Sequence, residues 1–330
     1  MTTSDVSIIT ARIKEQSGFI DDVLREVSSV VVGQRSMVER ILMALLCEGH
    51  ILLEGLPGLA KTLTIKTVAD VIDVAFQRVQ FTPDLLPSDL IGTVIYNQRT
   101  GEFTPKLGPI HSNIILADEI NRAPAKVQSA LLEAMAEKQV TIADQTYKLK
   151  DPFIVLATQN PIEQEGTYAL PEAQLDRFMF KVKVSYPSAS EEKLVLDRMT
   201  HLDQPRAKKI ISIDTLLKAR DLATQIYIDE KIKDYIVNIV FASRTPEKFG
   251  LKELSNKIQI GASPRATINL AKAARASAFL SHRGFVTPED IKTVAYDILR
   301  HRLVLTFEAD SEGITSEQIV KRILDKIEVP

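Results

Sequence analysis

The chain has 330 residues, and its 41 Lys and Arg residues nearly balance its 43 Asp and Glu residues, giving a formal charge of −2. Hydrophobic residues make up 45% and charged residues 25%. This composition is typical of a globular protein and excludes disordered, collagen-like and disulfide-stapled chains. The length predicts roughly two domains, and the near-zero charge argues against a dedicated non-specific nucleic-acid binder.

Three further features bear on where the protein works. No apolar run approaches the ~20 residues of a membrane helix, so we expect no membrane segment. The first residues lack the basic start and apolar core of a signal peptide. The one cysteine, Cys47, cannot form an internal disulfide, which fits a reducing compartment. Together these features predict a cytoplasmic protein.

Residues 1–30 predict an N-terminal helical arm, because apolar residues recur there at helical spacing among charged ones. A second helix follows the break at Val32-Gly33-Gln34. From His50 onward, short apolar runs alternate with helix-like stretches, which predicts an α/β fold with a parallel sheet covered by helices on both faces. These runs are 50–53, 75–81, 113–117, 153–157 and 178–184.

The strand signal fades after Tyr186-Pro187, and helical patterns dominate the rest of the chain. Ser263-Pro264 and Thr287-Pro288 are helix starts, because Ser and Thr cap helices and Pro suits their first turn. We therefore expect three parts: the arm at 1–30, an α/β core at 31–187 and an all-helical domain at 188–330.

Two segments of the expected core interrupt the alternation of strands and helices. Residues 92–110 predict a hairpin that turns near Gly101, and residues 139–149 predict another that turns near Asp144. A plain β-meander at the sheet edge is the alternative for both.

The segment Gly55-Leu56-Pro57-Gly58-Leu59-Ala60-Lys61-Thr62 lies between an apolar run and a helix-like stretch. A strand–loop–helix of this kind presents backbone N–H groups to phosphates at a helix N-terminus. Lys61 would reach the β- and γ-phosphates, and the Thr62 hydroxyl would bind Mg²⁺. Ala60 replaces the usual Gly, which requires a negative φ at that residue. The alternative is a Gly/Pro turn followed by a surface lysine.

Polar residues end the next two apolar runs of the expected sheet. Asp118 and Glu119 follow the run at 113–117; Asp118 would hold Mg²⁺, and Glu119 would act on the attacking water. Asn160 follows the run at 153–157 and could orient that water. The alternatives are a helix cap for the two acids and an Asn-Pro turn for Asn160.

Arginines are the remaining candidates, because a guanidinium is always charged and suits phosphate recognition. Arg177 could act on the nucleotide of a neighbouring subunit as an arginine finger, or could pair with Asp176 or Glu172. Arg265 has the same two interpretations, and Arg122 is a weaker candidate. The five histidines lack ligand spacing, so we expect no zinc site.

Taken in order, these motifs resemble those of the MoxR-type AAA+ ATPases over almost the whole chain. The longest matching run is 118–135, and Ala before the phosphate-loop lysine is usual in that family. The other matching segments are Val32-Gly33-Gln34, 55–62, 80–89, 108–110, 158–161, 170–178 and 263–266.

The resemblance implies an αβα P-loop core followed by an all-helical lid, which bind ATP and Mg²⁺ and hydrolyse ATP. Val32 and Gly33 would line the adenine pocket, and Thr62 and Asp118 would hold Mg²⁺. The implied nucleotide-binding residues are Val32, Gly33, Gly55, Leu56, Pro57, Gly58, Leu59, Ala60, Lys61, Thr62, Leu63 and Asp118. The implied catalytic residues are Glu119, Asn160 as sensor 1, Arg177 as a trans-acting finger and Arg265 as sensor 2.

The resemblance also implies a biological setting. Members of this family are chaperone-like remodelling ATPases that form rings, usually hexamers. They often act with a separate von Willebrand factor A domain protein in metal or cofactor insertion and complex assembly. The segments at 92–110 and 139–149 resemble inserts that face the ring pore. A nucleic-acid motor and a nucleotide-gated scaffold are the alternatives; the net charge disfavours the motor, and the complete acidic and arginine sets disfavour the scaffold.

Overall fold

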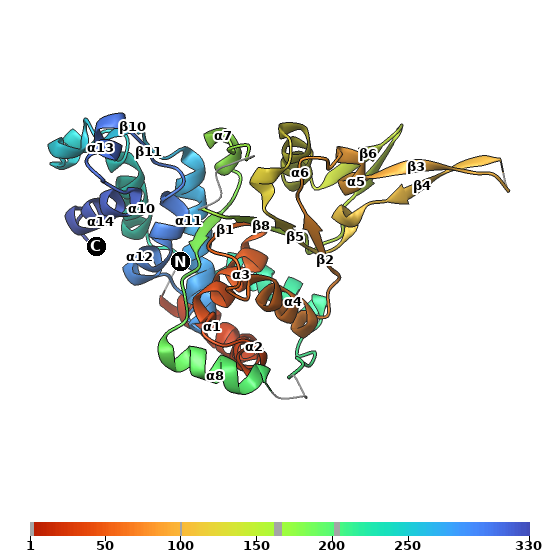
Figure 1. The fold of residues 1–330 in the computed structure, drawn as a ribbon. Helices are drawn as coiled ribbons and strands as arrows, with labels where there is room; N and C mark the ends of the chain where they lie inside the picture. Colours follow the sequence, from red (N-terminus) through yellow and green to blue (C-terminus); the bar gives the residue numbers. More distant parts are fainter. Residues whose placement is uncertain (1–2, 100, 162–166, 201–204) are drawn as a thin grey trace. The chain divides into compact units, whose positions relative to one another are not determined.

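The computed structural model describes residues 3–99, 101–161, 167–200 and 205–330 (Figure 1). Contacts within the chain group the residues into two units. The core unit comprises Asp21–Phe178 and Val182–Leu217, and the helical unit comprises Met1–Ile20, Met179–Lys181 and Lys218–Pro330. The boundaries expected from the sequence, at 30/31 and 187/188, differ from this grouping and stay a prediction.

Five strands form the main sheet, and all five apolar runs of the sequence contribute one strand each. β1 pairs with β8, β8 with β5 and β5 with β2, all in parallel. The predicted parallel sheet is therefore confirmed. In spatial order its strands are β2 (Phe76–Gln80), β5 (Ile114–Asp118), β8 (Ile154–Gln159), β1 (Ile51–Glu54) and β9 (Phe180–Lys183).

Helices cover both faces of this sheet. Alternate strand residues such as Ile115 and Val155 belong to one apolar cluster with Val127 and Leu131 of α6 (Ala125–Glu137). α4 (Lys61–Ile72) contacts β2 and β5 and packs on α3 (Arg35–Cys47). The inner strands β5, β8 and β1 have apolar side chains on both faces, because both faces are buried there. The remaining helices of this part are α2 (Phe19–Val30), α5 (Pro87–Ile91), α7 (Glu172–Leu175), α8 (Ala189–Met199) and the 3₁₀ turns η1 (Pro109–His111) and η2 (Ile120–Arg122).

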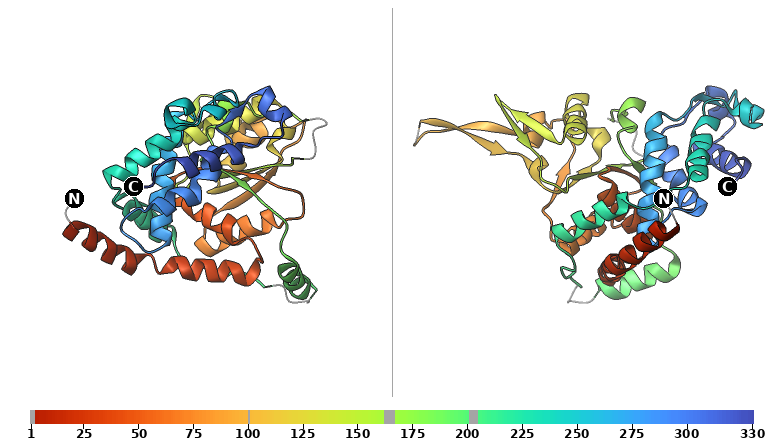
Figure 2. Two further views of the ribbon diagram at one scale, coloured as in Figure 1. Left: turned by 90° about the vertical axis from the view of Figure 1, so that its left-hand side faces the viewer. Right: turned by 180° about the vertical axis from the view of Figure 1, so that it is seen from behind.

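Both predicted hairpins are present in the core unit. β3 (Gly92–Asn97) pairs antiparallel with β4 (Glu102–Leu107), and β6 (Gln139–Ile142) pairs with β7 (Gln145–Lys148). The β3–β4 hairpin extends well beyond the main sheet (Figures 1 and 2). Near its tip the rings of Tyr96 and Phe103 lie 5.1 Å apart, although both side chains are largely exposed.

The helical unit is built from helices that pack mainly on one another. α11 contacts both α10 and α12. Ser263 caps α11 by accepting the backbone N–H of Arg265, and Asp290 accepts the backbone N–H of Thr287 at the start of α12. Both predicted helix starts are therefore confirmed. Its helices are α1 (Thr3–Gln16), α9 (Ile213–Thr224), which continues from the core unit, α10 (Glu230–Ala242), α11 (Pro264–Leu280), α12 (Pro288–Leu299), α13 (Phe307–Ser311), α14 (Ser316–Lys326), η3 (Pro246–Phe249) and η4 (Lys252–Leu254).

Two details go beyond the sequence prediction. The N-terminal arm consists of two helices, α1 and α2, rather than one continuous helix. The second half of the chain also contains a short antiparallel pair, β10 (Ile258–Ile260) with β11 (Val304–Leu305). These strands are too short to produce a clear apolar alternation. Within the described ranges, every helix is too short or too polar to span a bilayer.

Candidate nucleotide site

The phosphate-loop segment joins β1 to the N-terminus of α4 in the core unit, as its sequence predicts. Glycine is required at two of its positions: a Cβ on Gly55 would lie 2.8 Å from the carbonyl oxygen of Val184, and Gly58 has a φ of +83°. Ala60 has a φ of +55°, in the left-handed region. The expected negative φ at Ala60 is therefore wrong. Alanine tolerates this conformation at a cost of about 1–2 kcal/mol, so the loop geometry prevails over local preference.

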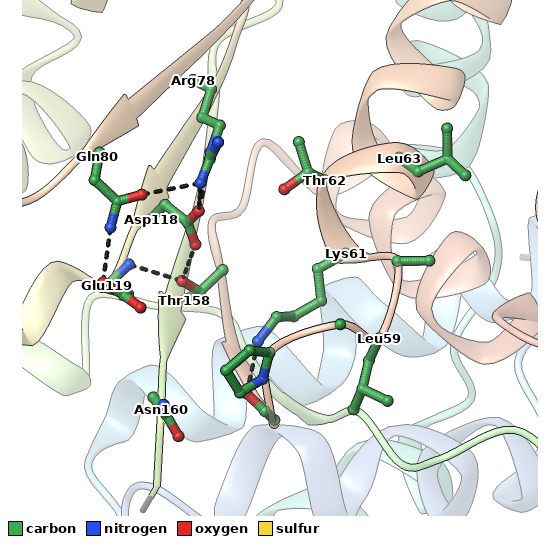
Figure 3. Close-up of a pocket in the computed structure, with 14 residues that line it drawn as sticks. Leu59, Lys61, Thr62, Leu63, Arg78, Gln80, Asp118, Glu119, Thr158 and Asn160 are labelled. Carbon is green, nitrogen blue, oxygen red and sulfur yellow. Dashed lines mark hydrogen bonds and ion pairs between the residues drawn. The ribbon is translucent and has the colours of Figure 1, made fainter. Parts of the chain in front are cut away.

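A cavity of about 380 Å³ lies beside this loop, at the carboxyl ends of the central strands (Figure 3). A space of this size is in the range of small-ligand sites. Among the described residues, the cavity is lined by every predicted residue of the phosphate loop except Leu56. The two predicted acids and Asn160 line it as well. Its lining residues are Gly55, Pro57, Gly58, Leu59, Ala60, Lys61, Thr62, Leu63, Arg78, Gln80, Asp118, Glu119, Thr158 and Asn160.

Lys61 is the cation of the loop. Its Nζ donates a 2.6 Å hydrogen bond to the carbonyl oxygen of Gly55. Burial lowers the pKa of the Lys61 ammonium, and the nearby carboxylates of Asp118 and Glu119 partly oppose that shift. A partly desolvated ammonium beside a helix N-terminus favours an anionic ligand.

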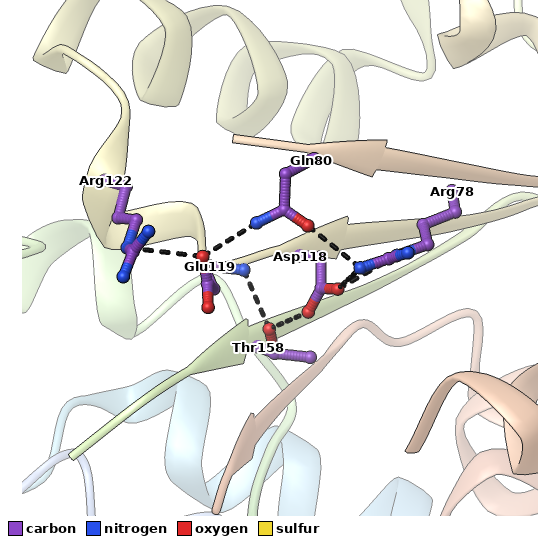
Figure 4. Close-up of polar contacts among 6 residues, drawn as sticks. All are labelled: Arg78, Gln80, Asp118, Glu119, Arg122 and Thr158. Carbon is purple, nitrogen blue, oxygen red and sulfur yellow. Dashed lines mark hydrogen bonds and ion pairs between the residues drawn. The ribbon is translucent and has the colours of Figure 1, made fainter. Parts of the chain in front are cut away.

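Asp118 ends β5, and both of its carboxylate oxygens accept hydrogen bonds (Figure 4). Oδ1 accepts from Thr158 Oγ1 at 2.6 Å. Oδ2 accepts from Nε and Nη2 of Arg78, at 2.9 and 2.6 Å. Asp118 and the Thr62 hydroxyl line the same cavity, and they are hard oxygen donors of the kind that Mg²⁺ prefers.

Glu119 follows directly, with a φ of +56° that turns the chain out of the strand. Its backbone N–H donates to Thr158 Oγ1 at 2.8 Å. Its Oε2 accepts from Gln80 Nε2 at 2.7 Å and lies 3.2 Å from Nε of Arg122. The Glu119 carboxylate is therefore held at the cavity wall by an amide and a guanidinium.

Three residues of this site were missed by the sequence analysis: Arg78, Gln80 and Thr158. Arg78 and Gln80 alternate along β2, and the register pairs Gln80 with Asp118 of β5. Polar residues two apart on a strand share a face, and this pattern was the available signal. The pattern indicates a site only once β2 is known to lie beside β5, and the sequence does not show this pairing.

The predicted arginines lie in different places. Arg177 is exposed, and its Nη1 donates to the carbonyl oxygen of Leu132 on α6 at 2.8 Å; it is not among the described residues that line the cavity. Arg265 lies in the first turn of α11, in the helical unit. Arg122, the weakest candidate in the sequence, forms the ion pair with Glu119.

Val32 and Gly33 line a second cavity of about 320 Å³, also within the core unit. Its walls come from α2, α3 and α8, with apolar residues such as Val27 and Val38 and the charged residues Glu191 and Arg198. Gln34 Nε2 donates to the Leu59 carbonyl oxygen at 3.4 Å, which connects this wall to the phosphate loop. Gln34 of the second cavity is thus hydrogen-bonded to Leu59, which lines the first cavity.

Comparison with known proteins agrees with this geometry. Residues 50–180 match the ATPase family associated with various cellular activities (AAA), and residues 253–323 match the AAA lid domain. A phosphate loop after β1 of a parallel sheet, acids at the end of β5 with β8 between these two strands, and a helical lid define an AAA+ ATPase.

The relatives narrow this class. Chaperone MoxR1 of Mycobacterium tuberculosis is 49% identical over 92% of this chain and 81% of its own length. Protein MoxR of Methylorubrum extorquens is 31% identical over 85% of this chain and 86% of its own length. A solved structure from Cytophaga hutchinsonii, 52% identical, covers 98% of both chains with a TM-score of 0.92.

The chain belongs to the MoxR family of chaperone-like AAA+ ATPases. The predicted family, the α/β core with a helical lid, and ATPase activity are thereby confirmed.

Proposed function

We propose that this ATPase binds Mg²⁺ and ATP at the core cavity and uses Glu119 to activate the attacking water. The observation that carries the proposal is that the phosphate loop, Asp118, Glu119 and Asn160 line one cavity. Their chemistry covers the requirements of phosphoryl transfer: phosphate binding, a metal ligand, a base and a group that orients water.

The binding steps follow from the donors of the loop. Backbone N–H groups at the start of α4 and the Lys61 ammonium bind the phosphates. Thr62 and Asp118 would hold Mg²⁺, which neutralises phosphate charge when bound. The apolar cavity that Val32 and Gly33 line takes the adenine ring, since Gln34 connects it to the phosphate loop.

The chemical step uses the two polar groups at the strand ends. The water oxygen attacks the γ-phosphorus while the bond to the β–γ bridging oxygen breaks, yielding ADP and phosphate. Glu119 accepts the proton of the water or orients it, and Asn160 positions the same water. Arg177 of a neighbouring subunit and Arg265 offset the developing negative charge.

The proposed biological role is based on the mycobacterial relative, which is named a chaperone. We propose a ring, with six subunits as the expected number, that remodels or assembles partner protein complexes. A separate von Willebrand factor A domain protein and metal or cofactor insertion are the expected partner and process. The hairpins β3–β4 and β6–β7 would face the pore, and the location would be the cytoplasm.

Glu119→Gln tests this assignment, because glutamine keeps the shape of the side chain but cannot accept a proton. We expect ATP binding to persist while phosphate release falls at least a hundredfold, measured with a fluorescent nucleotide and a phosphate sensor. Glu133→Gln, an exposed change on α6, is the matched control and should retain wild-type turnover. Wild-type turnover in Glu119→Gln would refute the role of Glu119.

A further inference from the structure

Arg78 has a place in the site that the proposed reaction does not use. Its side chain is half exposed, yet two of its nitrogens, Nε and Nη2, donate to a single oxygen, Oδ2 of Asp118 (Figure 4). The Asp118 carboxylate is only 15% exposed. The guanidinium therefore covers the side of this carboxylate that solvent or a metal ion would otherwise reach.

The other oxygen of Asp118 is engaged as well, because Oδ1 accepts from the buried hydroxyl of Thr158. A carboxylate oxygen has two lone-pair sites, and the two N–H groups of Arg78 use those of Oδ2. Asp118 can therefore offer Oδ2 to a metal ion only after Arg78 has moved away. The Arg78 guanidinium and Mg²⁺ would therefore compete for the same oxygen, Oδ2 of Asp118.

The same arginine is connected to the second acid. Nη2 of Arg78 also donates to Oε1 of Gln80 at 2.9 Å, and Gln80 Nε2 donates to Glu119. A chain of hydrogen bonds thus runs from Asp118 through Arg78 and the Gln80 amide to Glu119. Moving Arg78 removes the hydrogen bond that fixes the oxygen end of this amide.

We propose that Arg78 is a positioning residue that competes with Mg²⁺ for Oδ2 of Asp118 and is displaced from this oxygen when Mg²⁺ binds with the nucleotide. The proposal rests on the Mg²⁺ and ATP site described above. It assigns Arg78 an inhibitory role toward metal binding: the guanidinium neutralises Asp118 and must leave this carboxylate before Mg²⁺ can take its place.

A supporting role for Arg78 predicts the opposite sign. If Arg78 stayed on Asp118 in the loaded site and oriented it toward Mg²⁺, then removing the guanidinium would weaken metal binding. The sign of one measured shift therefore separates the two roles.

The experiment measures metal dependence rather than turnover. The full chain is titrated with Mg²⁺ in the presence of a fluorescent, non-hydrolysable ATP analogue, and the Mg²⁺ concentration at half-maximal binding is recorded. Direct binding of Mn²⁺, followed by electron paramagnetic resonance, gives a second readout without optical probes. For Arg78→Gln we expect the Mg²⁺ midpoint to fall about fivefold, the upper range for a half-exposed ion pair.

Two other variants separate occupancy of Oδ2 from general electrostatics. Arg78→Lys keeps the charge but loses the two-donor fork, so its midpoint should lie between those of the parent and Arg78→Gln. Arg122→Gln removes the same charge from Glu119 and leaves Asp118 untouched, so it should shift the midpoint less than twofold.

An unchanged or raised midpoint in Arg78→Gln overturns the proposal, and so does an equal fall in Arg122→Gln. Binding of the analogue without Mg²⁺ reports whether each variant is folded. If the parent chain failed to bind the analogue at any Mg²⁺ concentration, the proposed function itself would be refuted, together with the metal site on which Arg78 acts.

Discussion

Thr158 donates its hydroxyl hydrogen to Asp118 Oδ1 across 2.6 Å, from the end of one central strand to the end of the next. Oγ1 of Thr158 in turn accepts the backbone N–H of Glu119 at 2.8 Å. A single hydroxyl, on a residue that is 2% exposed, therefore orients the proposed metal ligand and fixes the turn that carries the proposed base.

Replacing Thr158 by valine should damage both functions of this hydroxyl. Valine has nearly the same shape but leaves the Glu119 N–H without its acceptor, which costs about 1–3 kcal/mol of stability. We expect a lower unfolding temperature and a turnover reduced about a hundredfold, since a small misplacement of a catalytic group costs on that scale. Calorimetry and phosphate release measure the two effects. Thr158→Ser keeps the hydroxyl and should approach wild-type values; equal losses in both variants would contradict this role.

Arg177 should act across a subunit boundary if the ring proposal holds. Removing an arginine finger costs about 10³–10⁵ in turnover in other phosphoryl-transfer enzymes, so pure Arg177→Ala protein should be inactive but still bind ATP. Lys61→Ala protein should fail to bind ATP yet still provide Arg177 to a neighbour.

Mixing these two inactive proteins gives the decisive measurement. In a mixed ring, an Arg177→Ala subunit binds ATP through its intact Lys61, and a neighbouring Lys61→Ala subunit provides the intact Arg177. Phosphate release should therefore reappear and be greatest at intermediate ratios of the two proteins. Mixtures that stay inactive although both proteins assemble together, as seen by native mass spectrometry, would argue against a trans-acting arginine.

His50 should make the stability of the core depend on pH. Its Nδ1 accepts the Val155 N–H at 3.0 Å and its Nε2 lies 3.2 Å from the Met135 carbonyl oxygen, so the buried ring is neutral. Burial lowers its pKa from 6.5 to about 4, and Lys138 adds to the shift. The unfolded chain therefore binds this proton first as the pH falls.

The expected loss is confined to a defined pH window. Above pH 6.5 this residue has no effect on the pH dependence; between pH 6.5 and 4 the free energy of unfolding should fall by about 3 kcal/mol. Denaturant titrations at several pH values measure the fall. Glutamine cannot titrate, so the free energy of unfolding of His50→Gln should fall by about 3 kcal/mol less over this pH range, whatever its absolute stability. Parallel slopes in the two proteins would contradict the assignment.

Ala60 provides a test of backbone strain in the phosphate loop. Its φ of +55° costs an alanine about 1–2 kcal/mol but costs glycine little. Glycine also loses more entropy on folding, about 0.4–1 kcal/mol, so Ala60→Gly should be neutral or stabilising by up to ~1.6 kcal/mol. Ala130→Gly, inside α6, should instead destabilise the chain by about 1 kcal/mol. Thermal melts of both variants measure the contrast, and destabilisation by Ala60→Gly would rule out the strain.

Much of the fold and site could be predicted because the relevant signals are local. The run ending at Leu53, the glycines of the loop and the helix-forming stretch from Lys61 are contiguous, so spacing alone indicated a phosphate loop. Acids at the end of an apolar strand are common by themselves, and Asp118 and Glu119 were recognisable because they follow a phosphate loop at a suitable distance along the chain. Both hairpins followed from turn residues between alternating runs.

The sequence by itself thus determined the parts of the core: which segments form the main sheet and the two hairpins, where the phosphate loop turns, and which acids and amide lie at strand ends. Only the tertiary structure decided how these parts meet. β1 pairs with β8 rather than with β2, and β5 lies between β2 and β8, an order that sheet packing sets and chain order does not reveal. That order brings Arg78, Gln80 and Thr158 against the two acids, because hydrogen bonds between neighbouring strands align their ends whatever their separation along the chain.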